Sequence, residues 1–478
     1  MTINILKIKG EKVKSLDGKF FIEELIFRQG IRDFQIFLFF DFCSLFNSIV
    51  KNMNVAVIGL GYVGCPLLKR CLECGLSAIG IDIDKNRILD LESGINKIST
   101  LDVSNFPQCI EKGNLKLSSD FDILKNAESV IICLPTPLTK QHTPDLSYIE
   151  SSVKSIAENA SKGVLVMLES TTYPGTTIEV MLPVLEKAFG KVGVDFYLGY
   201  SPEREDPGNP LSNFDNVPKV ISGVTEKCKN KAIFLYSKFV KKLVPVSSCS
   251  TAEMVKIWEN TFRAINISAV NELKMICDRM GMDVWEVIEA AKTKPYGFTP
   301  FYPGPGMGGH CIPVDPFYLT WKAKEYEIHT RFIELAGEIN FRMHSYVVEK
   351  VVSALNSQKK AANGARVLIF GLAYKANICD LRESPAFPII ERLQRLGIEF
   401  DYYDPFVPEI PSSRHFSHLA GKKCVQLSPN IVKDYDVCLM LTLHKDVPYE
   451  MIAKNAKSIV DTRNCMEKFI TNCEVIKA

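Results

Sequence analysis

One stretch of the chain constrains the fold more than any other. It reads NVAVIGLGYVGCPLLKRCLECGLSAIGIDID from Asn54 to Asp84, and it alternates an apolar strand, a glycine turn, a helix and a second strand. Such alternation is typical of a parallel sheet whose strands are joined by crossover helices. Gly59, Gly61 and Gly64 stand in a G-x-G-x-x-G frame directly after the first strand. The stretch therefore predicts an α/β fold.

The glycine turn also indicates a dinucleotide site. A side chain in the frame would block the approach of the backbone to a pyrophosphate, and the following helix directs its N-terminal amides at the phosphates. Asp82 closes the second strand at the offset expected of an acid that binds ribose hydroxyls. Because this acid would repel a 2′-phosphate, we expect NAD as the cofactor. The alternative is a structural turn followed by an incidental aspartate.

Two α/β regions flank a helical one. The apolar runs VIICLP and GVLVMLES extend the first sheet to about residue 245, and the segment from Ser250 to Ala291 has unbroken helical periodicity without proline. The strand–helix rhythm then restarts with ARVLIF and continues with DVCLMLT and KSIVDTRN. We therefore expect an N-terminal extension (1–52), a cofactor-binding domain (53–245), a central helical region with a cysteine loop (246–345) and a second α/β domain (346–478).

Composition excludes several classes of protein. The chain has 478 residues, too many for one ordinary core, with 46% hydrophobic and 23% charged residues and a net charge of +2. Nothing global attracts nucleic acid or a membrane surface, so we expect neither as a partner. The 15 cysteines lie singly in apolar segments, which suits reduced thiols in a cytoplasmic protein. Cys65, Cys71 and Cys74 lack zinc spacing, and we expect no metal.

The N-terminal extension carries an apolar run from Phe34 to Val50, which is short for a membrane span and is interrupted by Asp41. We expect no span and no signal peptide. The alternatives left open are a membrane-associated helix, an appendage, and a start site upstream of a functional chain that begins at Met53.

A loop rich in glycine and proline, GPGMGGHCIPVDPFYLT, runs from Gly304 to Thr320. It carries Cys311 and, four residues later, Asp315. A thiol flanked by glycines has no core to fill. Beside a nicotinamide, a thiol can trap an aldehyde as a thiohemiacetal, from which a hydride leaves to give a thioester. We therefore interpret Cys311 as a nucleophile, and the alternative is a buried structural thiol.

Four more residues are candidates for the same site. Lys256 and Asn260 are four apart on the long helix and share a face, from which they could donate hydrogen bonds to an oxyanion. Thr136 and Glu169 each follow a strand of the first sheet, at the edge where such sheets bind ligands. The alternative for Lys256 and Asn260 is an ordinary solvated helix face. The alternative for Glu169 is a surface acid or a helix-capping acid.

Taken together, the motifs resemble one family. In chain order they are GLGYVG, PTP, ESTTYPGTT, YSPEREDPGN, AEMVKIWENTFRAINIS, GPGMGGHCIPVDP, GLAYKANICDLRESPA and VDTRN. The set resembles the UDP-glucose/GDP-mannose dehydrogenases from Met53 onward. Members oxidise the C6 hydroxymethyl group of a nucleotide sugar to a carboxylate with two NAD⁺. The resemblance implies two Rossmann-like, doubly wound domains joined by a long central helix that forms a homodimer or a higher homo-oligomer.

The resemblance implies a role for each candidate. Cys311 matches the nucleophile, and Asp315 the carboxylate that assists it. Glu169 matches the residue that works with water in thioester hydrolysis, and Thr136 one that positions that water.

The remaining matches concern binding. Lys256 and Asn260 match the pair that stabilises oxyanions. The cofactor would be bound by Gly59, Gly61, Gly64, Asp82, Thr136 and Arg382. The UDP-sugar would be bound by Glu203, Arg204, Gly304, Gly306, Gly308, Gly309 and Lys375.

Within the family, YSPEREDPGN and GGHCIPVDPFYLTWKA look most like the branch that acts on UDP-N-acetylhexosamines, since UDP-glucose enzymes typically carry serine or threonine in place of His310. This implies UDP-N-acetylglucosamine as the substrate, for surface polysaccharide biosynthesis. UDP-N-acetylmannosamine and then UDP-glucose are the alternatives, and a two-electron hydroxyacid dehydrogenase, which needs no cysteine, is a distant one. For the arginine that UDP-glucose enzymes donate from the partner subunit, the sequence offers only Arg263 or Lys294.

Overall fold

The computed structural model describes residues 53–96, 101–139, 143–204, 214–309, 312–412 and 416–478. The chain divides into two units, Met1–Met53 and Asn54–Ala478, and the second contains a 6-stranded sheet, a 5-stranded sheet and a 2-stranded sheet. The predictions for residues 1–52, His310 and Cys311 lie outside the described residues.

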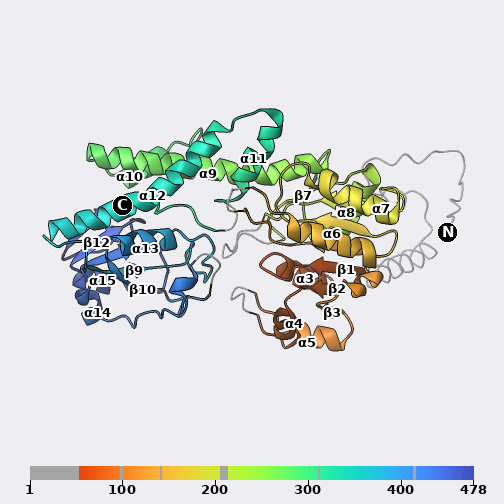
Figure 1. Ribbon diagram of the computed structural model, residues 1–478, viewed down its shortest axis with the longest axis horizontal. Helices are drawn as coiled ribbons and strands as arrows, with labels where there is room; N and C mark the ends of the chain where they lie inside the picture. The colour runs from red at the N-terminus through yellow and green to blue at the C-terminus, as the bar shows by residue number, and fades with distance from the viewer. Residues whose placement is uncertain (1–52, 97–100, 140–142, 205–213, 310–311, 413–415) are drawn as a thin grey trace, which may run out of the picture. The chain divides into compact units, whose positions relative to one another are not determined.

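The first sheet is parallel throughout, with the strand order β3-β2-β1-β4-β5-β6. Its strands are β1 (Asn54–Ile58), β2 (Ser77–Ile81), β3 (Leu115–Ser118), β4 (Ser129–Ile132), β5 (Leu165–Leu168) and β6 (Tyr197–Tyr200). The order reverses between β1 and β4, and a ligand crevice forms at the carboxyl ends of the strands at such a reversal. The predicted doubly wound α/β fold is confirmed (Figure 1).

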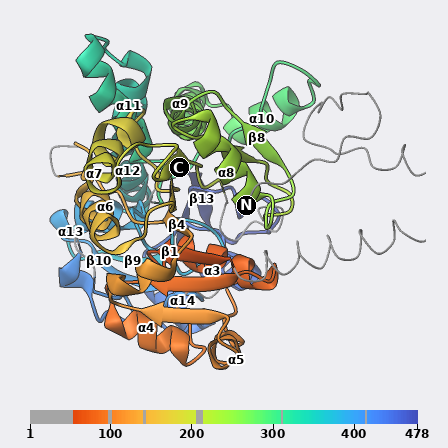
Figure 2. The same cartoon turned by 90° about the vertical axis from the view of Figure 1, so that its right-hand side faces the viewer.

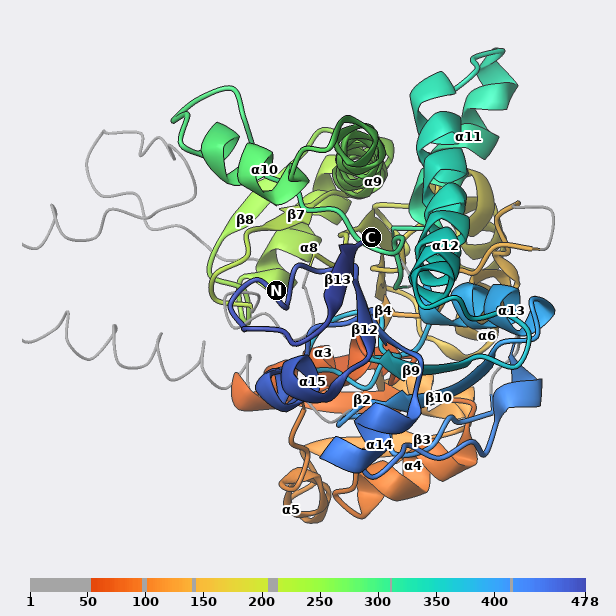
Figure 3. The same ribbon diagram turned by 90° about the vertical axis from the view of Figure 1, so that its left-hand side faces the viewer.

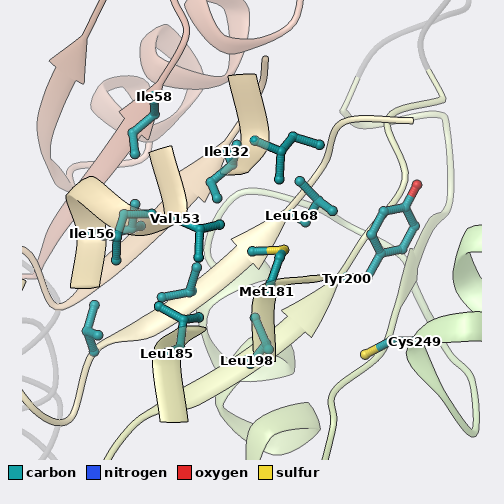
Figure 4. Close-up of a cluster of buried hydrophobic side chains, with 14 of the residues drawn as sticks. Ile58, Ile132, Val153, Ile156, Leu168, Met181, Leu185, Leu198, Tyr200 and Cys249 are labelled. Carbon is teal, nitrogen blue, oxygen red and sulfur yellow. The ribbon is translucent and has the colours of Figure 1, made fainter. Parts of the chain in front are cut away.

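Helices cover this sheet on two faces (Figure 2). Alternate strand residues such as Ile58 and Leu168 pack with Val153 and Leu185 of the helices on one face (Figure 4). The helical and short segments of this region are α3 (Gly64–Glu73), α4 (Lys85–Glu92), α5 (Phe106–Glu111), the 3₁₀ turn η1 (Phe121–Asn126), α6 (Ser147–Asn159), the π-helical turn η2 (Thr177–Met181), α7 (Leu182–Phe189), α8 (Glu226–Tyr236) and the parallel pair β7 (Lys219–Ile221) and β8 (Leu243–Pro245).

The central helix α9 (Cys249–Met280) begins where the Ser248 hydroxyl accepts a hydrogen bond from Thr251 N. The prediction that this helix continues to Ala291 is wrong. Gly281 adopts a left-handed conformation (φ 73°) and ends the helix, and the Asp283 side chain then caps a separate helix, α10 (Val284–Lys292). The other central helices are α11 (Asp315–Ala323), the 3₁₀ turn η3 (Lys324–Tyr326) and α12 (Arg331–Ser357), which packs along α9.

The second sheet is also parallel, with the order β10-β9-β11-β12-β13. Its strands are β9 (Arg366–Phe370), β10 (Glu399–Tyr403), β11 (Val437–Met440), β12 (Ser458–Asp461) and β13 (Glu474–Lys477). Helices α12 and α13 (Ala386–Arg395) lie on one face of the sheet, and α14 (Pro429–Asp434) and α15 (Tyr449–Asn455) lie on the other (Figure 3). Side chains of each pair of helices are buried against the strands. A 3₁₀ turn, η4 (Ser417–Leu419), precedes α14.

Two bulk properties bear on the sequence predictions. In the described part of the chain, every cysteine is a free thiol. Across those same ranges, no helix combines the length and the apolar character needed to cross a bilayer.

Candidate active site

The three glycines after β1 differ in what surrounds them. A Cβ atom on Gly59, whose φ is +90°, would lie 2.6 Å from the carbonyl oxygen of Cys133, and one on Gly64 would lie 1.9 Å from the Gly59 oxygen. Close packing therefore requires these two glycines. A Cβ on Gly61 would have no atom within 4 Å. The middle glycine thus leaves open space in front of the N-terminus of α3, where a pyrophosphate would bind.

Asp82 and Arg87 border this turn. The Asp82 carboxylate accepts hydrogen bonds from Leu60 N (2.9 Å) and Asp84 N (3.0 Å). Arg87, which the sequence reading missed, donates through Nε to the Leu60 oxygen (3.0 Å), and its Nη2 is buried with no hydrogen-bond partner among the described residues. An unpaired guanidinium nitrogen beside an open glycine turn fits an anionic or hydroxyl-rich ligand. The turn therefore fits NAD.

The predicted catalytic residues of the central region meet at the start of α11. Asn260 Nδ2 donates to Asp315 Oδ2 at 2.5 Å, and Asp315 is only 2% exposed. Burial raises the pKa of Asp315 to about 7, although the Lys256 ammonium and the Asn260 hydrogen bond lower it. Lys256 Nζ lies 3.5 Å from Glu203 Oε2. The arrangement supplies a buried carboxyl that exchanges its proton near neutral pH, beside two hydrogen-bond donors.

Glu169 is held by two protein donors. It is 2% exposed, accepts a hydrogen bond from Lys219 Nζ at 2.6 Å and another from the Tyr236 hydroxyl at 2.5 Å. Each donor engages a different carboxylate oxygen. The sequence reading identified neither donor, because Lys219 and Tyr236 lie 50 and 67 residues further along the chain.

Thr136 lies in the loop that follows β4 and is buried. Its hydroxyl donates to the Thr171 oxygen at 2.7 Å, and its carbonyl oxygen accepts a hydrogen bond from the Tyr318 hydroxyl. Tyr318 belongs to α11, the helix that begins at Asp315. These contacts fix the edge of the first sheet against the helix that begins with the buried Asp315 carboxyl.

Arg204 is engaged by α9. Its guanidinium forms a bidentate pair with Glu259, at 2.5 and 3.2 Å, and its Nη1 donates to the Pro218 oxygen at 2.6 Å. Its contact with substrate stays a prediction.

The glycines of the cysteine loop contact protein closely. A Cβ on Gly304 would lie 2.5 Å from Arg463 Nη1, and one on Gly306, whose φ is +129°, would lie 2.7 Å from His344 Nε2. The position of Arg463, in the VDTRN motif, is a contribution that the sequence reading missed. Whether these glycines also contact the sugar nucleotide stays a prediction.

The loop between β9 and α13 packs against the last two glycines of the cysteine loop. Gly308 and Gly309 would each place a Cβ within 2.8 Å of the Tyr374 side chain, and Lys375 follows Tyr374 in this loop. The ring of Tyr374 thus packs directly against the glycine-rich segment that leads to the cysteine.

Arg382, in the same loop, reaches the dinucleotide turn. Its Cζ lies 4.4 Å from the centroid of the Tyr62 ring, and its Nη2 pairs with Asp380 at 2.6 Å. A cavity of about 1170 Å³ is lined by these three residues together with Thr261, Val314 and His344. The cavity therefore joins the glycine turn, the central helices and the loop after β9.

Comparison with known proteins gives consistent matches along the chain. The UDP-glucose/GDP-mannose dehydrogenase family is matched by its NAD binding domain at residues 53–240, its central domain at 250–342 and its UDP binding domain at 368–468.

Individual relatives differ in substrate. The chain is 38% identical to UDP-N-acetyl-D-glucosamine 6-dehydrogenase of Pseudomonas aeruginosa, over 75% of this chain and 84% of that protein. It is 36% identical to UDP-N-acetyl-D-mannosamine dehydrogenase of Pyrococcus horikoshii, over 87% and 96%. A solved structure of a UDP-D-ManNAc dehydrogenase from the same organism superimposes with a TM-score of 0.79 at 34% identity, covering 89% of this chain and 99% of that one.

Proposed function

The chain belongs to the UDP-glucose/GDP-mannose dehydrogenase family and is an NAD-dependent nucleotide-sugar dehydrogenase, and we propose that it oxidises the C6 hydroxymethyl group of UDP-N-acetylglucosamine to a carboxylate. The observation that supports this chemistry best is the buried Asn260–Asp315 contact beside Lys256. It lies at the end of the loop that carries Cys311 in the sequence.

The proposed reaction has two oxidations and one hydrolysis. The alcohol loses a proton and a hydride to become an aldehyde, and the Cys311 thiolate adds to the aldehyde carbon to give a thiohemiacetal. Loss of a second hydride gives a thioester, which water cleaves to the carboxylate and the free thiol. NAD⁺ supplies the hydride acceptor, twice per substrate. Lys256 and Asn260 stabilise the oxyanions that form at C6.

Asp315 is the proposed proton acceptor. With a pKa of about 7 it holds a proton below neutral pH and releases it above. We therefore expect kcat to rise as the pH increases through about 7, and to lose this rise in Asp315→Asn. An unchanged pH profile in the variant would remove Asp315 from the mechanism.

Glu169 and Glu203 are the two candidates for the carboxylate that acts on water when the thioester is cleaved. The resemblance points to Glu169, but its two oxygens already accept hydrogen bonds from Lys219 and Tyr236. Glu203 lies beside Lys256 instead. We assign the water step to Glu203 and a structural role to Glu169. Glu203→Gln should then release two NADH per active site in a rapid burst and turn over slowly afterwards.

Glu169→Gln is the matched control for this assignment. It should lower the melting temperature without producing a burst, because the buried Lys219 loses its counter-charge. A burst in Glu169→Gln, with none in Glu203→Gln, would restore the assignment implied by the resemblance.

The substrate is tested by measuring NADH formation with UDP-N-acetylglucosamine, UDP-N-acetylmannosamine, UDP-glucose and GDP-mannose. We expect the highest kcat/KM with the first and two NADH per sugar consumed. UDP-N-acetylmannosamine is the second candidate, since the Pyrococcus horikoshii relative is named for that sugar and is matched over almost its whole length. If the glucosamine epimer were inert while the mannosamine epimer reacted, the substrate assignment would change and the mechanism would stand.

A homodimer through α9 is part of the proposal. Met254, Trp258 and Phe262 follow one another at four-residue spacing on this helix and are 39%, 55% and 47% exposed. Such a continuous apolar stripe is typical of an interface. Light scattering should give a dimer for the natural chain and a monomer for Trp258→Asp. A monomeric natural chain would contradict the proposal.

The free thiols of the described residues support a cytoplasmic location, which is also part of the proposal.

A further inference from the structure

We propose that His444 and Asp404 act as a positioning pair, which fixes the turn that carries Lys375 and so sets the affinity for the UDP part of the substrate. The inference rests on the proposed function and on the prediction, implied by the family resemblance, that Lys375 binds the UDP-sugar. Neither His444 nor Asp404 is placed in contact with substrate.

The topology of the second sheet brings the pair together. β9 lies between β10 and β11, so the loop from Gly371 to Pro385 leaves the sheet between the ends of these two neighbours. Asp404 follows β10 directly, and His444 lies shortly after β11. One residue that holds the loop therefore follows each neighbouring strand, Asp404 after β10 and His444 after β11.

Asp404 holds the loop before Lys375. Its Oδ2 accepts hydrogen bonds from Leu372 N (2.8 Å) and Ala373 N (3.1 Å). From the other side, the Thr442 hydroxyl donates to the Ala373 oxygen at 2.6 Å. The backbone two residues before Lys375 is thus fixed from both neighbouring strands.

His444 holds the loop after Lys375. Asn377 N donates to His444 Nδ1 at 3.0 Å, and Asn377 Oδ1 accepts a hydrogen bond from Lys445 N at 2.9 Å. Asn377 has a φ of 62°, a left-handed conformation that these two bonds stabilise. Lys375 therefore lies between two anchored residues, and its backbone has little freedom to move.

The imidazole lies between the two anchors. Because Nδ1 accepts from the backbone, the proton of a neutral ring is on Nε2, which lies 3.3 Å from Asp404 Oδ2 but, among the described residues, makes no hydrogen bond of good geometry. His444 is 0% exposed, and the Phe406 ring packs against it with centroids 5.1 Å apart. The pair thus spans the carboxyl end of β9 in a dry environment, where a lost hydrogen bond is not replaced by water.

Two amide substitutions separate the two ring nitrogens. In His444→Asn the side-chain oxygen takes the place of Nδ1 and still accepts from Asn377 N. In His444→Gln the side-chain amide reaches the place of Nε2 and Asp404, and the acceptor for Asn377 N is lost. We expect His444→Gln to raise KM for the UDP-sugar about tenfold, with kcat and KM for NAD⁺ little changed. His444→Asn should stay within about threefold of the natural chain.

A double-variant cycle distinguishes positioning from general damage. Lys375→Ala should raise KM for the UDP-sugar and weaken UDP binding measured by calorimetry. Adding His444→Gln to Lys375→Ala should cause no further loss of UDP affinity, because the residue being positioned is gone. Additive losses, or equal rises in KM for NAD⁺ and the UDP-sugar, would overturn the proposal.

Two outcomes distinguish a failure of the proposed function from a failure of the positioning role. If Lys375→Ala leaves UDP affinity unchanged, the placement of the UDP-sugar under the proposed function fails. If Lys375→Ala weakens UDP binding but His444→Gln does not, only the positioning role fails.

Thr442→Val is a milder second variant, because it removes only the hydroxyl that holds Ala373 and keeps the shape of the side chain. It should raise KM for the UDP-sugar selectively, and an unchanged KM would contradict the proposal.

Discussion

The two parallel sheets present their first strand–helix connection in different ways. In the first sheet the chain passes from β1 to α3 through Gly59–Val63, with open space at Gly61. In the second it passes from β9 to α13 through Gly371–Pro385, a loop held by Asp404 and Thr442. One connection exposes backbone to a ligand, and the other is packed with protein.

The difference shows what the sheet decides and what it leaves to the loops. Both strand orders reverse beside the first strand, at β1/β4 and at β9/β11, and each reversal creates a crevice at the carboxyl ends. Whether backbone amides or side chains then meet the ligand depends on the length and contacts of the connection. A Cβ added at Gly61 should therefore affect cofactor binding, whereas contacts removed from the second connection should affect stability and the binding of the UDP-sugar.

Gly64→Ala should have the largest effect. The new Cβ would lie 1.9 Å from the Gly59 oxygen, so α3 would have to move away from β1. We expect the free energy of unfolding to fall by about 3 kcal/mol or more, with loss of NAD⁺ binding. Urea denaturation followed by fluorescence measures this. An unchanged free energy of unfolding would show that the turn accepts a Cβ at this position, and it would contradict the close packing of α3 against β1.

Asp404→Asn should be next, and its effect should depend on pH. Burial raises the pKa of Asp404, but the neighbouring His444 imidazole and hydrogen bonds from backbone amides outweigh it and hold the pKa below its ordinary value. Its carboxylate therefore stabilises the fold above pH ~4, and this contribution is lost as the pH falls through the lowered pKa. We expect the variant to lose about 2 kcal/mol at pH 7, and less at pH 3. Equal losses at the two pH values, in urea titrations, would refute the role of its charge.

Gly61→Ala is the counterpart of Gly64→Ala in the same turn. Its Cβ would have no neighbour within 4 Å, so the melting temperature without cofactor should not change. KM for NAD⁺ should rise about tenfold, because the methyl group enters the space proposed for the pyrophosphate. An unchanged KM for NAD⁺ would place the pyrophosphate elsewhere.

Asp82→Asn should have the smallest effect. Asparagine can still accept a hydrogen bond from Leu60 N, but it no longer repels a 2′-phosphate. We expect the ratio of kcat/KM for NADP⁺ to that for NAD⁺ to rise about fivefold, roughly 1 kcal/mol. Initial rates with each cofactor measure this ratio, and no change would remove Asp82 from cofactor selection.

The sequence predicted the elements that local patterns specify. Apolar runs and the glycine frame located β1, α3 and β2, and the restart of the rhythm located β9 and β11. The helix end at Gly281 was missed, because its apolar periodicity continues on both sides of the glycine. A single left-handed residue there outweighs a favourable pattern.

In the candidate site, too, local sequence predicted some features and not others. Lys256, Asn260 and Asp315 were predicted from spacing and residue type, and the structure adds the direct contact between Asn260 and Asp315. No local pattern in the sequence indicates the partners of Glu169, or the Arg87 nitrogen that lacks a hydrogen-bond partner in the described part of the chain.

By itself, the sequence determined the α/β fold, the dinucleotide turn and the residue types available for catalysis, because each is written in neighbours along the chain. Only the tertiary structure decided which carboxylate is enclosed by protein donors and which lies beside Lys256. It also decided that Asp315 titrates near neutral pH and that Asp404 and His444 meet across the end of β9. These properties depend on burial and on contacts between residues distant in sequence, and burial and long-range contacts exist only after the sheets and helices have packed.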